Sequence, residues 1–173
     1  MSSEHDFPDV DAFTAGTVGE PGQRVFYLQA IAGTEVVTLR LEKGQVAALA
    51  QYLAELLADL PTPPAEQVVA SGMGLKEPVD AEWIVGQLGV VFDESRDRMV
   101  VRADEIAAEE EDDDDDESTL GFARFALTRA QVQAFVVRAA TLLEAGRPPC
   151  PLCGRPIDPE GHMCIKTNGH AKH

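Results

Sequence analysis

The first third of the chain alternates apolar and polar residues and then changes to a helical period. Residues 13–18, 24–32 and 35–41 alternate and are separated by Gly-containing turns, which predicts three strands of an antiparallel meander. From residue 44 the apolar side chains recur every three or four positions, which predicts an amphipathic helix that ends before Pro61. Its predicted buried face consists of Val46, Leu49, Leu53, Leu56, Leu57 and Leu60.

The same order of patterns recurs later in the chain. Residues 83–92, 98–103 and 120–127 are again typical of strands, after a Pro- and Gly-rich connection. Thr128 and Gln131 have the spacing of a capping box, which predicts the start of a second helix. Its predicted buried face consists of Val132, Phe135, Val136, Ala139, Leu142 and Leu143, and Gly146 follows its end.

The two predicted helices suggest an internal repeat. A shift of 86 positions places Leu41 on Leu127 and Gln45 on Gln131, and a shift of 74 places Arg24 on Arg98. The difference between the shifts is about the length of an acidic insertion. The sequence therefore predicts an α+β fold of duplicated β-meander-plus-helix units, in which antiparallel sheet packs against two helices. Chance similarity between two amphipathic helices is the alternative, because such patterns are common.

These patterns divide the chain into three parts. Residues 1–12 are polar and acid-rich, so we expect a flexible N-terminal lead-in. Residues 13–147 form the predicted duplicated body, with halves at about 13–60 and 81–146. Residues 148–173 form a predicted zinc-binding tail.

The net charge of the chain limits the classes of partner that it is expected to bind. The chain of 173 residues has a formal net charge of -16, and a run of consecutive acidic residues fills positions 109–117. Like charges repel and bury no apolar surface, so we expect this run to be a disordered loop between two strands. The acidic balance argues against binding to nucleic acid or to an anionic membrane, which Lys and Arg side chains drive.

The compartment is predicted from the N-terminus and the cysteines. The first ten residues are acidic and lack an apolar segment, and no run of about 18 apolar residues occurs, so we expect neither export nor a membrane span. All three cysteines lie in one C-terminal cluster rather than spread in pairs. That arrangement is typical of a protein in the reducing cytoplasm.

The C-terminal cluster has the spacing of a zinc site. Cys150 and Cys153 form a C-x-x-C pair, and His162 and Cys164 are two positions apart, so both can face one cation on an extended segment. His170 is an alternative fourth ligand. Such a full ligand set favours structural over catalytic zinc, because a catalytic site keeps an open position. A redox dithiol and unliganded thiols are the alternatives, although the prolines nearby argue against the helix that a thioredoxin-type motif needs.

The ending Cys-Pro-Leu-Cys-Gly-x-Pro-Ile-Asp-Pro-Glu-Gly-His-x-Cys, after a β-rich acidic body, resembles an uncharacterised actinobacterial family. That family is a domain of unknown function that covers nearly the whole chain. The resemblance implies an actinobacterial origin and a cytoplasmic protein, and it implies no activity, substrate or catalytic residue.

Two functions remain open at this stage. No catalytic residues or nucleotide-binding motif can be assigned from the sequence, and His5 looks like a lone residue in a flexible tail. The favoured hypothesis is a non-enzymatic adaptor with a structural zinc tail and a protein partner. The alternative is an enzyme or enzyme subunit acting on a phosphorylated metabolite in a cleft between the repeat halves. A deep cleft with clustered arginines would favour the enzyme, and the candidates are Arg24, Arg40, Arg98, Arg102 and Arg124.

Overall fold

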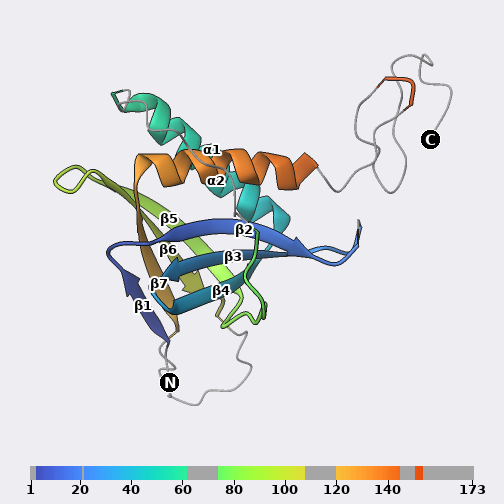
Figure 1. Cartoon of the computed structure of the whole chain (residues 1–173), viewed down its shortest axis with the longest axis horizontal. Helices are drawn as coiled ribbons and strands as arrows, with labels where there is room; N and C mark the ends of the chain where they lie inside the picture. Colours follow the sequence, from blue (N-terminus) through green and yellow to red (C-terminus); the bar gives the residue numbers. More distant parts are fainter. Residues whose placement is uncertain (1–2, 21, 62–73, 108–119, 145–150, 154–173) are drawn as a thin grey trace.

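The computed structural model describes residues 3–20, 22–61, 74–107, 120–144 and 151–153. Two sheets lie below two helices in the view of Figure 1. The α+β class is therefore as predicted. The elements are β1 (Glu4–Phe7), β2 (Ala12–Val18), β3 (Val25–Ala32), β4 (Glu35–Leu41), α1 (Lys43–Asp59), β5 (Val85–Asp93), β6 (Arg98–Glu105), β7 (Phe122–Leu127) and α2 (Arg129–Glu144).

The strands form two sheets that meet at one edge. One sheet has the order β2-β3-β4 and the other β1-β7-β6-β5, and every neighbouring pair is antiparallel except β1 with β7. Residues just before β5 join them, because the Arg40 N–H of β4 donates to the Trp83 carbonyl (3.1 Å) and the Ile106 N–H donates to the Ile84 carbonyl (2.8 Å). The short stretch ahead of β5 therefore connects both sheets.

Four phenylalanine rings join both sheets to α2. Phe7 of β1 stacks on Phe125 of β7 with centroids 5.7 Å apart, and Phe125 lies 5.5 Å from Phe13 of β2. Phe13 in turn lies 5.0 Å from Phe135 of α2. All four side chains are buried. Since burying such a side chain stabilises a fold by about 1.5–3 kcal/mol, this cluster is a main source of the contact between the layers.

In each helix a glutamine at the third position caps the first turn. The Thr128 N–H donates to Gln131 Oε1 (2.9 Å) and the Gln131 N–H donates to Thr128 Oγ1 (3.2 Å), which is the predicted capping box of α2. At α1 the Glu42 N–H donates to Gln45 Oε1 (2.8 Å). These bonds satisfy backbone donors that a helix start leaves without partners.

The structure differs from the predicted lead-in at residues 1–12, because residues 4–7 form strand β1. This strand pairs in parallel with β7, from Glu4 beside Phe122 to Phe7 beside Phe125. Phe7 and Val10 are buried. Four mostly polar residues give no strand pattern of their own, so their order comes from pairing with a strand more than a hundred positions away.

The two halves have the same order of three antiparallel strands and a helix. Strand register corrects the predicted alignment by one position. Phe26 pairs with Leu41 and Met99 pairs with Leu127, so β3 and β6 are related by 73 positions rather than by the 74 predicted from Arg24 and Arg98. The corrected shift superposes buried positions, whereas the predicted one follows a chance match of two arginines.

Two predicted segments lie outside the described residues. They are the acidic run at 109–117 and all of the tail except residues 151–153. Among the residues that the structure describes, no helix is long and apolar enough to cross a membrane.

Candidate functional site

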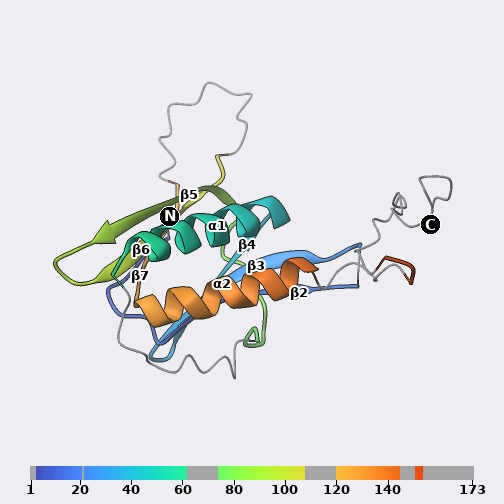
Figure 2. The same ribbon diagram turned by 90° about the horizontal axis from the view of Figure 1, so that it is seen from above.

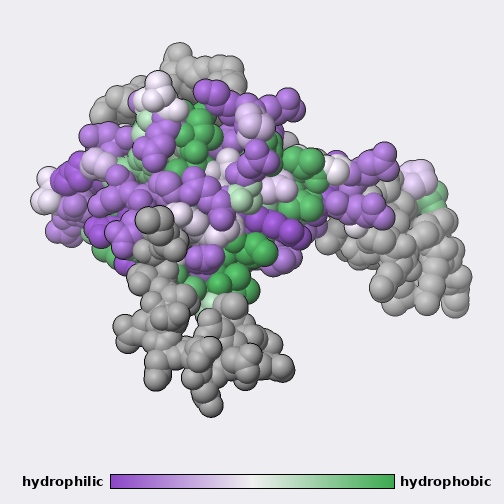
Figure 3. All heavy atoms as spheres, turned by 90° about the horizontal axis from the view of Figure 1, so that it is seen from below, coloured by the Kyte–Doolittle hydropathy of each residue, from purple (hydrophilic) through white to green (hydrophobic). Residues whose placement is uncertain are grey.

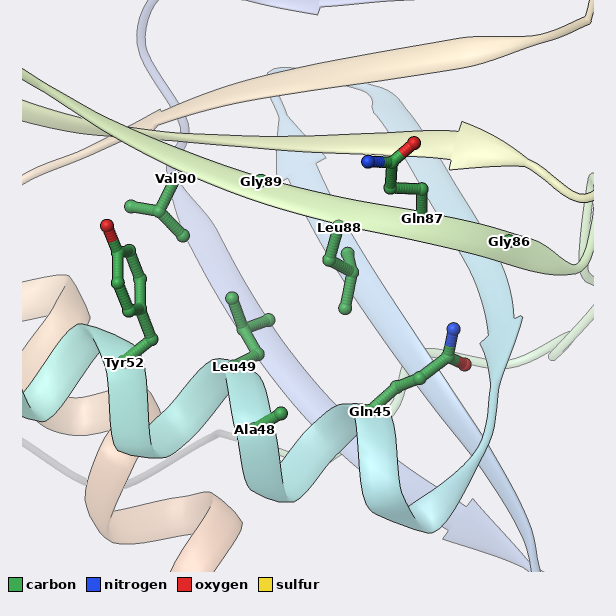
Figure 4. A pocket seen from close by; sticks show the side chains of 9 residues that line it. All are labelled: Gln45, Ala48, Leu49, Tyr52, Gly86, Gln87, Leu88, Gly89 and Val90. Atoms are coloured by element: carbon green, nitrogen blue, oxygen red, sulfur yellow. The ribbon is translucent and has the colours of Figure 1, made fainter.

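A groove lies between α1 and the edge strand β5 (Figure 4). Its volume is about 660 Å³, which is within the range of roughly 300–1,000 Å³ that ligand-binding sites occupy. Helix α1 contributes Gln45, Ala48, Leu49 and Tyr52, and β5 contributes residues 86–90. The groove therefore lies between an element of the first half and an element of the second.

The lining of the groove is apolar and carries no charged side chain. Leu49 of α1 and Leu88 of β5 point toward one another, and Tyr52 and Val90 face each other at one end (Figure 4). The Gln87 side chain points away from the helix. Such a surface suits an apolar side chain of a ligand better than a phosphate or a carboxylate.

The pairing of β5 with β6 shows which backbone groups face the groove side. Successive strand residues direct their N–H and C=O groups to opposite sides. The Glu105 N–H donates to the Gly121 carbonyl on the β7 side of β6 (2.8 Å), so Arg102, three positions earlier, directs its groups to β5. Arg102 faces Gly89, which therefore directs its own groups to β6.

Leu88 and Val90, on either side of Gly89, direct their N–H and C=O groups away from β6. The Val85 carbonyl has the same outward direction and accepts a bond from Gln45 Nε2 of α1 (3.1 Å). In the part of the chain that the structure describes, no such bond reaches the outward groups of Leu88 or Val90. An edge strand with open backbone groups beside an apolar groove is a template for an additional strand.

A second cluster surrounds His5, which the sequence analysis treated as a lone residue in a flexible tail. That view is wrong, because His5 lies in β1 and its ring is stacked between Phe7 (6.0 Å) and Trp83 (5.7 Å). Its Nδ1 lies 3.3 Å from Glu35 Oε1 and its Nε2 lies 2.5 Å from Glu82 Oε2. These contacts tie β1 to the start of β4 and to the segment before β5.

No local signal in the sequence could reveal the His5 cluster, because its partners lie 30 and 77 positions away. Among the described residues, no group of three or more His, Cys, Asp or Glu side chains is placed to hold a metal ion. The contacts of His5 connect β1 to the β2-β3-β4 sheet through Glu35 and to the segment before β5 through Glu82.

The predicted arginines do not form a phosphate site at the groove. None of Arg24, Arg40, Arg98, Arg102 and Arg124 lines it. Arg102 Nη2 lies 2.8 Å from Asp104 Oδ1, and that carboxylate raises the pKa of the Arg102 guanidinium. Arg102 faces Arg124 on the neighbouring strand, and its guanidinium carbon lies 4.7 Å from the centre of the Phe122 ring.

The predicted zinc ligands lie almost entirely outside the described residues. Cys150, His162, Cys164 and His170 are outside them, and Cys153 is half-buried in the short described stretch 151–153. The structure therefore does not test whether these residues come together.

The described residues on the lower face of the molecule form a mostly hydrophilic surface (Figure 3). Figure 3 shows the side that lies below in Figure 1, and its described part is mostly hydrophilic with small apolar areas. Exposed Ile84, Ile106 and Leu120 lie near one another, because Ile106 pairs with Ile84 and Glu105 pairs with Gly121. The groove is consequently the better candidate site.

Fold and site together define an α+β protein with two similar halves and an apolar groove between them. The chain belongs to the family described as "Protein of unknown function (DUF3090)", whose model matches residues 5–164. The predicted resemblance to a domain of unknown function that covers nearly the whole chain is thereby confirmed. Comparisons with curated proteins and with solved structures gave no match.

Proposed function

We propose that this protein is a non-enzymatic interaction module that binds an apolar segment of a protein partner. The observation that supports this proposal is the uncharged, apolar lining of the groove between α1 and β5. A groove of this kind gains free energy by removing apolar surface of a partner from water. The open backbone groups of Leu88 and Val90 beside it add polar contacts that suit a peptide.

The enzyme hypothesis receives no comparable support from the groove. A phosphorylated substrate needs Arg or Lys side chains, or a cluster of backbone N–H groups, around its phosphate. The five candidate arginines lie elsewhere, and Arg102 is already paired with Asp104. The chemistry of the lining therefore favours a peptide side chain as ligand.

We infer that the body arose by duplication of one β-meander-plus-helix unit. Two reciprocal hydrogen bonds support this inference. Gln45 Nε2 of α1 donates to the Val85 carbonyl at the start of β5 (3.1 Å), and Gln131 Nε2 of α2 donates to the Val10 carbonyl just before β2 (2.6 Å). Chance similarity of two helices gives no reason for this exchange between the halves.

We further propose that the tail binds one structural zinc ion through Cys150, Cys153, Cys164 and His162, with His170 as the alternative histidine. The donor set of three thiolates and one imidazole is typical of closed, tetrahedral zinc sites. Because thiolate ligands must stay reduced, such a tail fits a cytoplasmic protein. In this proposal the zinc tail is a second contact for the partner.

The test of the interaction module uses peptide selection and a matched pair of variants. Ala48 and Ala58 are both exposed on α1, but only Ala48 lines the groove. We expect a random peptide library displayed on phage to yield binders of the wild-type protein, with affinity at least tenfold weaker for Ala48→Arg and unchanged for Ala58→Arg. Failure to select any peptide, or equal binding by both variants, would contradict the proposal.

A further inference from the structure

The edge strands β2 and β5 occupy corresponding positions in the two halves. Each lies at one end of its sheet and pairs antiparallel with the next strand. The alignment of β3 with β6 given above then relates β2 to β5 residue by residue. The pair Phe13–Ala30 corresponds to Leu88–Ala103, and the pair Ala15–Leu28 corresponds to Val90–Val101.

The helices correspond in the same way, through the glutamines that cap them. Gln45 of α1 corresponds to Gln131 of α2, because each accepts the N–H three residues before it and donates to the other half. Counting on from these residues, Leu49 corresponds to Phe135 and Tyr52 corresponds to Arg138.

In the first half, the edge of β2 is covered by α2. The rings of Phe13 and Phe135 fill the space between strand and helix, with centroids 5.0 Å apart. Arg138 Nε donates to the outward carbonyl of Ala15 (3.2 Å), and Gln131 Nε2 donates to that of Val10 (2.6 Å). Aromatic side chains and a donor to the edge carbonyl therefore occupy this side of the fold.

In the second half, the corresponding position is the open groove. Leu49 corresponds to Phe135, and Leu88 corresponds to Phe13. Tyr52 occupies the position that corresponds to Arg138. Of the two bonds to the strand edge, only the one from Gln45 to Val85 is kept. The groove thus corresponds to the space that the rings of Phe13 and Phe135 fill between β2 and α2. Among the described residues, no side chain of α1 donates to the Val90 carbonyl as Arg138 of α2 donates to the Ala15 carbonyl.

We propose that the β5 edge accepts an extended segment of a protein partner as an additional strand, with an aromatic side chain between Leu49 and Leu88 and Lys or Arg residues beside it. This proposal rests on the proposed function and names its binding mode. The added strand would donate to the Leu88 and Val90 carbonyls and accept from their N–H groups. Its aromatic side chain would supply what Phe13 and Phe135 supply at the β2 edge.

The described residues that flank positions 62–73 contact α2 and β3. Pro61, just before them, accepts a bond from Arg129 of α2, and Lys76, just after them, exchanges bonds with Gln29 of β3 (2.7 and 3.0 Å). Helix α2 and β5 lie on opposite sides of α1 (Figure 2). The contact of Pro61 with α2 therefore lies on the side of α1 away from the groove (Figure 2).

Charge argues against a second copy and for a basic partner. Each chain has a formal net charge of -16, so two copies repel each other. Nine acidic residues lie in the run at 109–117. A segment with Lys or Arg residues is attracted by the net negative charge of the chain.

The experiment uses the peptides selected against the full chain. We expect them to contain an aromatic residue with Lys or Arg beside it, and to slow hydrogen exchange at the Leu88 and Val90 amides by at least tenfold. N-methylation of the peptide nitrogens that face β5 is expected to weaken binding at least tenfold, while methylation of the alternate nitrogens changes it little. Deletion of residues 109–117 is expected to weaken binding severalfold at low salt.

A pair of variants tests the same mode from the protein side. Val90→Pro removes an outward N–H that makes no bond to β6, whereas Val90→Ala keeps that N–H and shortens the side chain. The proline variant is expected to lose the most affinity. If peptides lose affinity for Ala48→Arg yet leave both amides unprotected and tolerate methylation at every position, strand addition is wrong and the interaction module stands.

Other outcomes give the groove a different occupant and overturn the proposal. A wild-type dimer in sedimentation that Ala48→Arg converts to monomer assigns it to a second copy. Faster exchange at Leu88 and Val90 after replacement of residues 62–73 by a Gly-Ser linker of equal length assigns it to the chain itself. Peptides selected without aromatic or basic residues would contradict the stated chemistry of the partner.

Discussion

Four side chains occupy corresponding positions beside the edge strands β2 and β5. Phe13 and Phe135 fill the space between β2 and α2, whereas Leu88 and Leu49 leave a groove between β5 and α1. Helix α1 also lies farther from β5 than α2 lies from β2, so the separation of the elements and the smaller side chains together leave the groove open. Residue size at corresponding positions therefore contributes to the position of the site.

This difference predicts opposite effects of exchanging the residues. Leu49→Phe adds volume beside open space, so we expect the free energy of unfolding to stay within about 1 kcal/mol of the wild type while peptide binding is lost. Phe135→Leu removes volume from a closed contact and is expected to cost about 1–2 kcal/mol. Urea denaturation of both variants measures these values. A large loss for Leu49→Phe would show that the groove cannot accept a ring.

At the scale of elements, periodicity predicted most of the fold. Residues 35–41 were predicted as a strand with the observed bounds, and both helices were predicted within a few residues of theirs. Their apolar spacing is a local property, because each element buries one face. Strand β1 could not be predicted in this way, since its order depends on β7 and on contacts of His5 with distant glutamates.

The groove could not be predicted from the sequence either. Leu49 and Leu88 each fit the core pattern of their element, and only the separation of α1 from β5 leaves space between them. The predicted alignment of the halves was shifted by one residue in the strands, and that error would have matched the wrong positions of β3 and β6. Register depends on pairing between strands, which one sequence does not reveal.

Strand β1 is expected to contribute to the stability of the fold through Phe7. Phe7 is 6% exposed and stacks on Phe125, so Phe7→Ala is expected to lower the free energy of unfolding by about 3–5 kcal/mol. Asp6→Ala changes an exposed side chain of the same strand and is the matched control, with an expected effect below about 0.5 kcal/mol. Thermal and urea denaturation measure both. Equal, small effects would mean that β1 is a loose lead-in after all.

At the scale of the whole molecule, the body has a hydrophobic core of its own. Among the described residues, the buried apolar side chains of this core lie between Phe7 and Leu142. The body is therefore expected to stay folded when the tail loses metal, unlike an isolated zinc finger, whose folding depends on its metal.

Metal analysis tests this division of the molecule. We expect one zinc per wild-type chain under reducing conditions, with loss of zinc in Cys150→Ser and His162→Ala and retention in His170→Ala. A chelator is expected to remove zinc and leave the far-ultraviolet circular dichroism of the body nearly unchanged. Retention in His162→Ala with loss in His170→Ala would make His170 the ligand, and a metal-free wild type would contradict the zinc site.

Calorimetric titration of a selected peptide tests most directly whether the groove between the halves is the binding site. For the wild type and Ala58→Arg we expect equal affinity and a negative heat-capacity change, because binding removes apolar surface from water. For Ala48→Arg we expect at least tenfold weaker binding. Equal affinity of Ala48→Arg and Ala58→Arg for the peptide would contradict this function of the groove.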